Sequence, residues 1–281
     1  DDDSGDGTLE HPFRGPTRAF RAATLAYGSA DGTLCYLLPG EYTWGPAPWP
    51  PIVTSDRWPV LTPAPGVSRE DVVVTPHDPV SGFGTTLMSA RNLTLRGHRP
   101  IRGGTFAWID HCDAYGPGPD GDPFNSKIFN WTDYYGVYVT NCTADGYRNG
   151  VRDAALARQV AVTRVGVPFG QTGLLINAST SGLQASDQSH GDVLRWLLWD
   201  NNRENFITYG LYAVQANVQG LFVETQAPYD AFRVDDLAFV NVHISKNAES
   251  AAGSWWEATT NHLLLWHVSM PDQVLRWAQD D

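Results

Sequence analysis

The residues best suited to acid–base chemistry gather in the second half of the chain. Asp187, His190 and Asp192 lie close together, and Arg233 and Asp235 follow further along. A pair of carboxylates beside a histidine supplies the proton donor and acceptor that cleave a glycosidic bond. We therefore predict these five residues as candidate catalytic groups.

A second interpretation of Asp192 needs no catalysis. Asp192, Asn217, Asp236 and Asn261 each precede a short apolar run, at separations of 25, 19 and 25 residues. Asp and Asn are favoured at turns because they tolerate a left-handed backbone and bond to nearby amides. A repeating turn position would account for Asp192 and Asp236, whereas Asp187 and His190 fall outside that repeat.

A second group of acidic residues precedes a loop rich in Gly and Pro. Asp110 and Asp113 flank His111, and oxygen-rich loops of this kind suit Ca²⁺. We predict Asp110 and Asp113 as candidate calcium ligands, although the spacing is not that of an EF-hand. No other cofactor is indicated.

Candidate substrate-binding residues are arginines and tryptophans. Arg148 or Arg152 suits either the base of a lyase or a clamp for a carboxylate, since a guanidinium presents a planar fork of donors, and Arg203 could line the same groove. Trp44 and Trp49 lie in a proline-rich stretch and suit the wall of a binding groove. The alternative is that this stretch only covers the core.

The charge of the chain restricts its partners. The 281 residues carry a formal net charge of −12, and Lys127 and Lys246 are its only lysines. An acidic surface disfavours nucleic acid and anionic membranes. It also disfavours an anionic polymer, unless arginines gather locally or a cation bridges the charges. The apolar runs are far shorter than the roughly 20 residues of a membrane-spanning helix.

The N-terminal residues form a specific pattern. A turn-rich opening at 3–8 and Pro12-Phe13 precede helical apolar spacing over 18–27, with Thr17 as the predicted N-cap and Gly28 as the stop. Residues 32–42 then predict a strand, a Pro-Gly turn and a second strand.

This order resembles the entry of right-handed parallel β-helix proteins of the pectate-lyase-like superfamily, in which a short helix covers the first coil. The resemblance implies an all-β fold: a right-handed parallel β-helix, or solenoid, with a short N-terminal capping helix. It also implies export, so we expect a secreted protein.

Short strand-like runs recur between turn residues from Asn92 onward, at spacings that fit the coils of a solenoid. The runs between Ser189 and Val268 resemble planctomycete-type β-helix-repeat proteins, a group without an assigned reaction. We predict one domain over 1–281, with a cap and first coil at 1–43, a proline-rich excursion at 44–85 and repeating coils at 86–281.

The three cysteines cannot all pair within the chain. Cys112 and Cys142 would stack on successive coils, either as a disulfide or as buried thiols.

The sequence thus favours an extracellular carbohydrate-active protein whose partner is a polysaccharide, with hydrolase or lyase activity. The alternative is a non-catalytic carbohydrate-binding or adhesion protein. In an enzyme, two acids and a base should converge in an open cleft with a shifted pKa. In a binding protein, exposed aromatic side chains should line the cleft and the acids should point into turns. The sequence leaves open the polysaccharide, catalysis itself and the oligomeric state.

Overall fold

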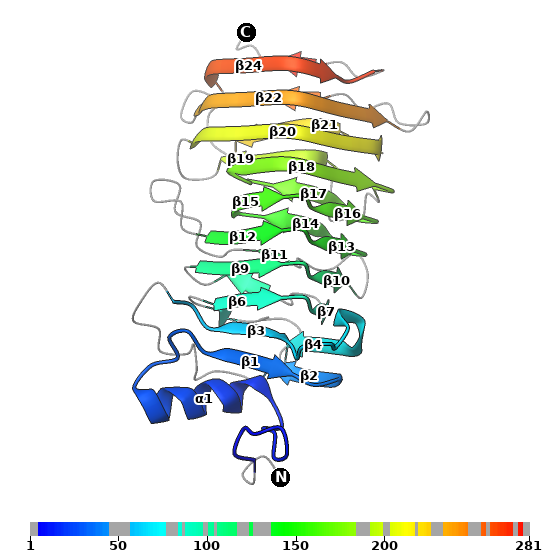
Figure 1. Ribbon diagram of the computed structural model, residues 1–281. Helices are drawn as coiled ribbons and strands as arrows, with labels where there is room; N and C mark the ends of the chain where they lie inside the picture. The colour runs from blue at the N-terminus through cyan, green and yellow to red at the C-terminus, as the bar shows by residue number, and fades with distance from the viewer. Residues whose placement is uncertain are drawn as a thin grey trace.

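The computed structural model is an elongated stack of coils with one helix at its N-terminal end (Figure 1). The structure describes residues 5–44, 57–76, 84–85, 88–97, 101–103, 106–116, 124–125, 136–183, 192–198, 203–216, 219–225, 233–246, 254–256, 259–271 and 275–277. None of the helices in these ranges is long and apolar enough to cross a membrane.

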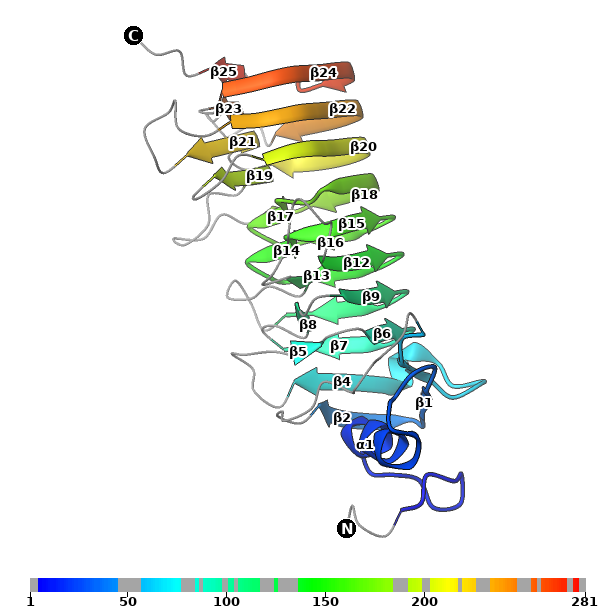
Figure 2. The same cartoon turned by 90° about the vertical axis from the view of Figure 1, so that its left-hand side faces the viewer.

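The helix α1 (Pro16–Tyr27) confirms the predicted capping helix, but it begins earlier than the spacing indicated. Its N-cap is Gly15, and Pro16 occupies the first turn, where its missing N–H costs nothing. Gly28 ends the helix in the left-handed conformation and donates its N–H to the carbonyl oxygen of Thr24, 2.8 Å away. The helix lies across the first coil (Figure 2) and buries Phe20 in the core.

The described strands form three columns of parallel neighbours, which confirms the all-β, parallel fold. The first column holds β1 (Leu34–Leu37), β3 (Val60–Pro63), β6 (Met88–Arg91), β9 (Phe106–Asp110), β12 (Gly136–Thr140) and β15 (Ala154–Arg158). The second holds β2 (Gly40–Trp44), β4 (Val72–Pro76), β7 (Thr94–Arg96), β10 (Asp113–Tyr115), β13 (Thr143–Asp145) and β16 (Ala161–Thr163).

The first two columns merge in the C-terminal half, because β18 pairs with both β15 and β16. They continue as the long strands β18 (Leu174–Ser181), β20 (Arg203–Ala216), β22 (Arg233–Lys246) and β24 (Thr259–Ser269). The third column is a separate sheet of β5 (Gly84–Thr85), β8 (Ile101–Gly103), β11 (Phe124–Asn125), β14 (Asn149–Arg152), β17 (Val167–Gly170), β19 (Asp192–Leu198), β21 (Gln219–Thr225), β23 (Ser254–Trp256) and β25 (Leu275–Trp277).

One residue in the left-handed conformation turns the chain from the first column to the second in successive described coils. The strand registers place these residues above one another, with φ between 49° and 69°: Asn92, His111, Asn141, Gln159, Asn177, Gly210, Asn241 and His267. Such a residue bends the backbone within one position, and Asn and Gly adopt it at low cost. The corners separate two strands in the coils up to β15 and β16, and they lie within the long strands from β18 onward.

The predicted turn repeat is wrong in its members. Asp192 begins β19 in the third column, whereas Asp236 lies in β22 of the other sheet. Asn261 pairs with Asp235 rather than with Asp236, and Asn217 lies outside the described residues. The reason is that coil length varies: paired residues lie 18 positions apart between Leu156 and Leu174, but 33 apart between Leu174 and Ile207.

Part of the predicted excursion at 44–85 instead forms regular coil. Strands β3 and β4 pair with their neighbours in the first and second columns. Pro63 and Pro76 are the last residues of these strands. Residues 45–56, which include Trp49, lie outside the described residues.

The columns enclose an apolar core along the length of the stack. Trp196 of β19 meets the ring of Phe206 edge-on at 5.6 Å and that of Phe239 at 5.7 Å, which joins the third column to the other sheet. Cys112 and Cys142 occupy successive coils as buried free thiols. Burial raises the pKa of Cys142 well above its ordinary value, so this thiol stays protonated.

The corner conformation can be tested at Gln159, which is exposed and has φ 53°. Gln159→Val should lower the free energy of unfolding by about 1–2 kcal/mol, because a β-branched side chain disfavours this conformation. Gln159→Gly should change it little. The control is Arg158→Val, an exposed position of β15. Equal urea midpoints for the two valine variants would contradict this role of the corner.

Candidate anion-binding pocket

Three arginines surround a small pocket on the third column. It has a volume of about 120 Å³ and is lined by Arg148, Asn149, Arg152, Val167, Gly170, Gln171 and Arg195. Arg148 and Arg152 are two of the predicted substrate-binding residues, so the structure brings these two together. A pocket of this volume has room for a charged group.

Strand register creates this pocket. Arg152 of β14 pairs with Gly170 of β17, and Gly170 pairs with Arg195 of β19. The two arginines therefore stand two strand spacings apart, about 10 Å between backbones. Gly170 carries no side chain on the strand between them. A Cβ there would lie at ordinary van der Waals distance, 3.5 Å from Cγ of Arg152 and 3.8 Å from the carbonyl oxygen of Arg195, so the position beside Gly170 borders both arginines.

Acidic and aromatic neighbours hold two of the arginines in place. Arg152 Nε lies 3.3 Å from a carboxylate oxygen of Asp153, and Arg195 Nε lies 3.6 Å from one of Asp192. The guanidinium of Arg195 also lies over the ring of Phe222, 5.4 Å from its centroid. The three arginines and these two carboxylates together carry a formal charge of +1.

The arrangement suits recognition of an oxyanion. The side chains of Arg152 and Arg195 are 30% and 18% exposed, so each is partly desolvated and open to solvent at one end. A guanidinium binds a carboxylate, sulfate or phosphate through two parallel N–H···O bonds, and these bonds strengthen where water is excluded.

Asp192, predicted as catalytic, lies behind this pocket. Its side chain is 0% exposed and its carboxylate faces Arg195. It can therefore act on a bound group only through Arg195, as a positioning residue. Asp187 and His190 lie outside the described residues.

The other predicted catalytic and binding residues lie apart from this pocket in the fold. Arg233 and Asp235 occupy β22 and form an ion pair, with Nε 2.9 Å from a carboxylate oxygen. Asp235 also accepts the backbone N–H of Asn261 at 3.2 Å. Arg203 begins β20 and Trp44 ends β2, and the structure describes only the backbone of these two residues.

The predicted calcium ligands use their oxygens within the protein. Asp110 accepts hydrogen bonds from Thr140 at 2.6 Å and from Asn141 at 2.8 Å, and lies 3.0 Å from Nδ1 of His111. Among the described residues, no group of three or more His, Cys, Asp or Glu side chains could hold a metal ion. The calcium site at Asp110 and Asp113 stays a prediction.

Asp113 stands on the other side of the corner. It accepts a hydrogen bond from Thr143 at 2.6 Å and pairs with Arg69 at 2.9 Å. Arg69 belongs to the short 3₁₀ turn η1 (Arg69–Asp71), so this ion pair ties the turn to the stack.

Exposed aromatic side chains occupy the outer face of a different column. Trp108 of β9, Tyr209 of β20 and Trp266 of β24 are each between 41% and 57% exposed. Tyr209 and Trp266 share one register line, with Val240 between them. These aromatic side chains do not line the pockets described for this structure, so the aromatic criterion for a binding protein stays a prediction.

Arg195 was missed by sequence reasoning, although a signal exists. Arg152 ends the segment Asn-Gly-Val-Arg from Asn149, and Arg195 ends Asp-Val-Leu-Arg from Asp192. In each segment an Asx residue comes first, two small or apolar residues follow, and the arginine is last. An alignment of these two segments would have placed both arginines on one column.

Comparison with family models, with curated proteins and with solved structures gave no match to this chain.

The hydrogen bonds to Asp110 predict a pH dependence of stability. Burial alone would raise the pKa of this carboxyl, but bonds from Thr140, Asn141 and His111 outweigh it and hold the pKa below its ordinary value of 3.8. A lowered folded-state pKa stabilises the protein above the unfolded-state pKa, and the gain is lost as pH falls through the folded-state value.

Asp110→Asn should therefore lower the free energy of unfolding at pH 7 by about 1–2 kcal/mol. The difference from the parent should shrink in acid below pH ~4, where the parent carboxyl also takes up its proton. Glu41→Gln, at a side chain that is 81% exposed, is the control. A difference that stays constant across this pH range in urea titrations would contradict the ionised role of Asp110.

Proposed function

We propose that this chain is a right-handed parallel β-helix of the pectate-lyase-like kind, exported from the cell, which binds a carboxylated polysaccharide through the arginine pocket. The observation that carries the proposal is the convergence of Arg148, Arg152 and Arg195 around the open position at Gly170. The ligand groups that fit are carboxylates on an extended polymer.

Charge explains why a local arginine cluster matters. A chain with a net charge of −12 repels a polyanion at long range. An acidic polymer becomes a suitable ligand only where arginines gather, and the pocket supplies such a place. The attraction acts over a few ångströms and is partly buried, so salt screens it less than it screens surface charges.

The shape of the third column suits an extended chain. The register line of Arg152 and Arg195 runs through Asn125 and Arg102 towards the N-terminus, and through Phe222 towards the C-terminus. A linear polymer lying along this column would run across successive strands of the sheet. The pocket itself would hold one charged substituent and leave the sugar rings outside.

Cleavage of the bound polymer is the second candidate function. The observation that favours it is chain order: Asp187 and His190 precede β19 by a few positions, and β19 supplies Arg195 to the pocket. Incubation with the polymer, followed by measurement of reducing ends and of unsaturated products by ultraviolet absorbance, separates a hydrolase, a lyase and a binding protein. Cleavage that is lost in Asp187→Ala/His190→Ala would establish catalysis.

Binding is tested with polygalacturonate, dextran sulfate and neutral dextran by titration calorimetry. Arg152→Gln and Arg195→Gln should each weaken polygalacturonate binding roughly 10- to 100-fold, the equivalent of about 1.5–3 kcal/mol for a charge-assisted hydrogen bond. Arg96→Gln removes the same charge from an exposed arginine outside the pocket and should change affinity little.

The three polymers distinguish the alternatives. Tighter binding of dextran sulfate than of polygalacturonate would replace carboxylate with sulfate as the recognised group. Equal losses in Arg96→Gln and in the pocket variants would show that overall charge, rather than the pocket, attracts the polymer. Binding of neutral dextran at the same affinity would contradict recognition of an anion.

A further inference from the structure

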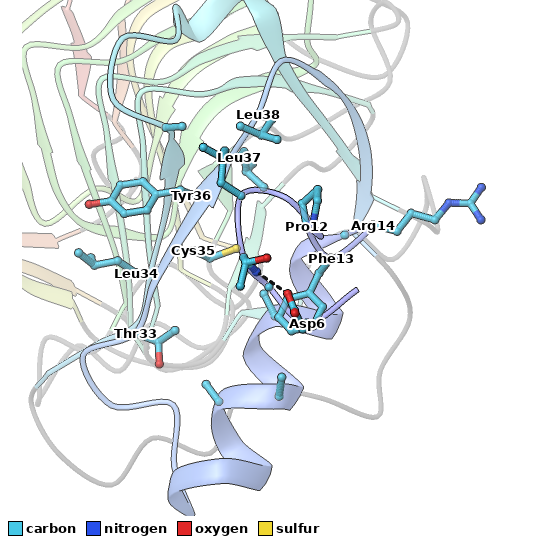
Figure 3. Close-up of a pocket in the computed structure, with 18 of the residues that line it drawn as sticks. Asp6, Pro12, Phe13, Arg14, Thr33, Leu34, Cys35, Tyr36, Leu37 and Leu38 are labelled. Atoms are coloured by element: carbon cyan, nitrogen blue, oxygen red, sulfur yellow. Dashed lines mark hydrogen bonds between the residues drawn. The ribbon is translucent and has the colours of Figure 1, made fainter. Parts of the chain in front are cut away.

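A second, larger cavity lies between the capping helix and the first coil. It has a volume of about 750 Å³, within the range of ~300–1,000 Å³ typical of small-molecule sites. Its walls come from α1, from the loop before it and from β1, as Figure 3 shows. This cavity belongs to the cap and shares none of its lining residues with the arginine pocket.

Small side chains on the helix leave this space open. Ala19, Ala22, Ala23 and Ala26 line the cavity, and their spacing of three, four and seven positions places them on one helix face. A capping helix that only sealed the core would be expected to fill such a face with larger apolar side chains. The alanine row instead leaves a trough along about 10 Å of helix, at 1.5 Å per residue.

The opposite wall is also apolar. Cys35 and Leu37 of β1 are buried and face the helix across the cavity, and the ring of Phe13 lies at its side (Figure 3). Tyr42 contributes its ring, while its hydroxyl donates to the carbonyl oxygen of Leu38 at 2.8 Å. The interior thus offers mainly carbon and sulfur to a ligand.

The charged residues of the cavity lie at its edge. The carboxylate of Asp6 accepts the backbone N–H of Thr8 at 3.0 Å, which is the bond drawn in Figure 3. The side chain of Arg14 points away from the cavity in the same view. A ligand with a negative head group would therefore meet a carboxylate and no inward-pointing guanidinium among the labelled residues.

We propose that this cavity binds a short unbranched alkyl chain with a neutral polar end. The alanine row extends along the helix for about 10 Å, the facing side chains are apolar, and Asp6 at the polar edge is exposed. A branched or ring-shaped ligand of equal carbon number would not follow the alanine row. The site is independent of polysaccharide binding, so the failure of either proposal leaves the other untouched.

The probe is 1-octanol, measured by saturable binding in titration calorimetry and by the shift in melting temperature of the full chain. Ala23→Phe places a ring in the trough and should weaken binding at least 10-fold. Leu25→Phe adds the same kind of ring at a position that is 68% exposed and does not line the cavity, so it should bind as the parent does. Cyclooctanol and octanoate should both bind more weakly than 1-octanol.

A second measurement decides the question if Ala23→Phe fails to fold. The Cys35 thiol lies in the cavity wall, so 1-octanol should slow its alkylation by a small thiol reagent several-fold in the parent protein. Unchanged alkylation of Cys35 at saturating 1-octanol, or equal affinity in Ala23→Phe and the parent, would overturn the proposal. Tighter binding of octanoate would overturn the neutral end, and tighter binding of cyclooctanol the unbranched chain.

Discussion

The left-handed residue that turns the chain from the first column to the second, in the coils from Asn92 onward, is the constraint on which the rest of the structure depends. A parallel stack forms only if every coil turns at the same place, because a displaced corner shifts the next strand out of register with its neighbour. The single-residue corners at positions such as Asn141, Asn177 and Asn241 meet this demand. Loops of very different length can then leave the stack without disturbing it.

The same constraint produces the arginine pocket. Arg152 and Arg195 are 43 positions apart in the sequence, yet the register of β14, β17 and β19 places them two strands apart on one face. The bare backbone of Gly170 between them gives the space for a ligand group. A stack of parallel strands thus converts sequence positions that match along its coils into a line of residues.

The sequence predicted the parts of this fold that depend on local chemistry. Gly28 ends the helix and short apolar runs form the strands, and both effects depend on neighbouring residues alone. The capping helix and the parallel β fold could therefore be predicted from the sequence. The strand register could not be predicted, since equal spacing in the sequence marks equal positions in the fold only when the coils have equal length. Asp192 and Asp236 were therefore grouped wrongly, and Arg195 was missed.

The candidate site was predictable to a similar degree. Arg148 and Arg152 were identified by residue type and proximity, and the structure places both at one pocket. Asp110 and Asp113 have the residue type of calcium ligands, and in the structure their oxygens accept hydrogen bonds from side chains on the next coil. Those donors lie 30 positions away in the sequence, where no local pattern reveals them.

The most direct test of the central claim is a crystal structure of the protein with a galacturonate trimer. Our account predicts one carboxylate over Gly170, within hydrogen-bond distance of the guanidinium groups of Arg152 and Arg195, with the sugar rings along the third column. A trimer bound on another face, or an empty pocket at saturating trimer, would contradict it.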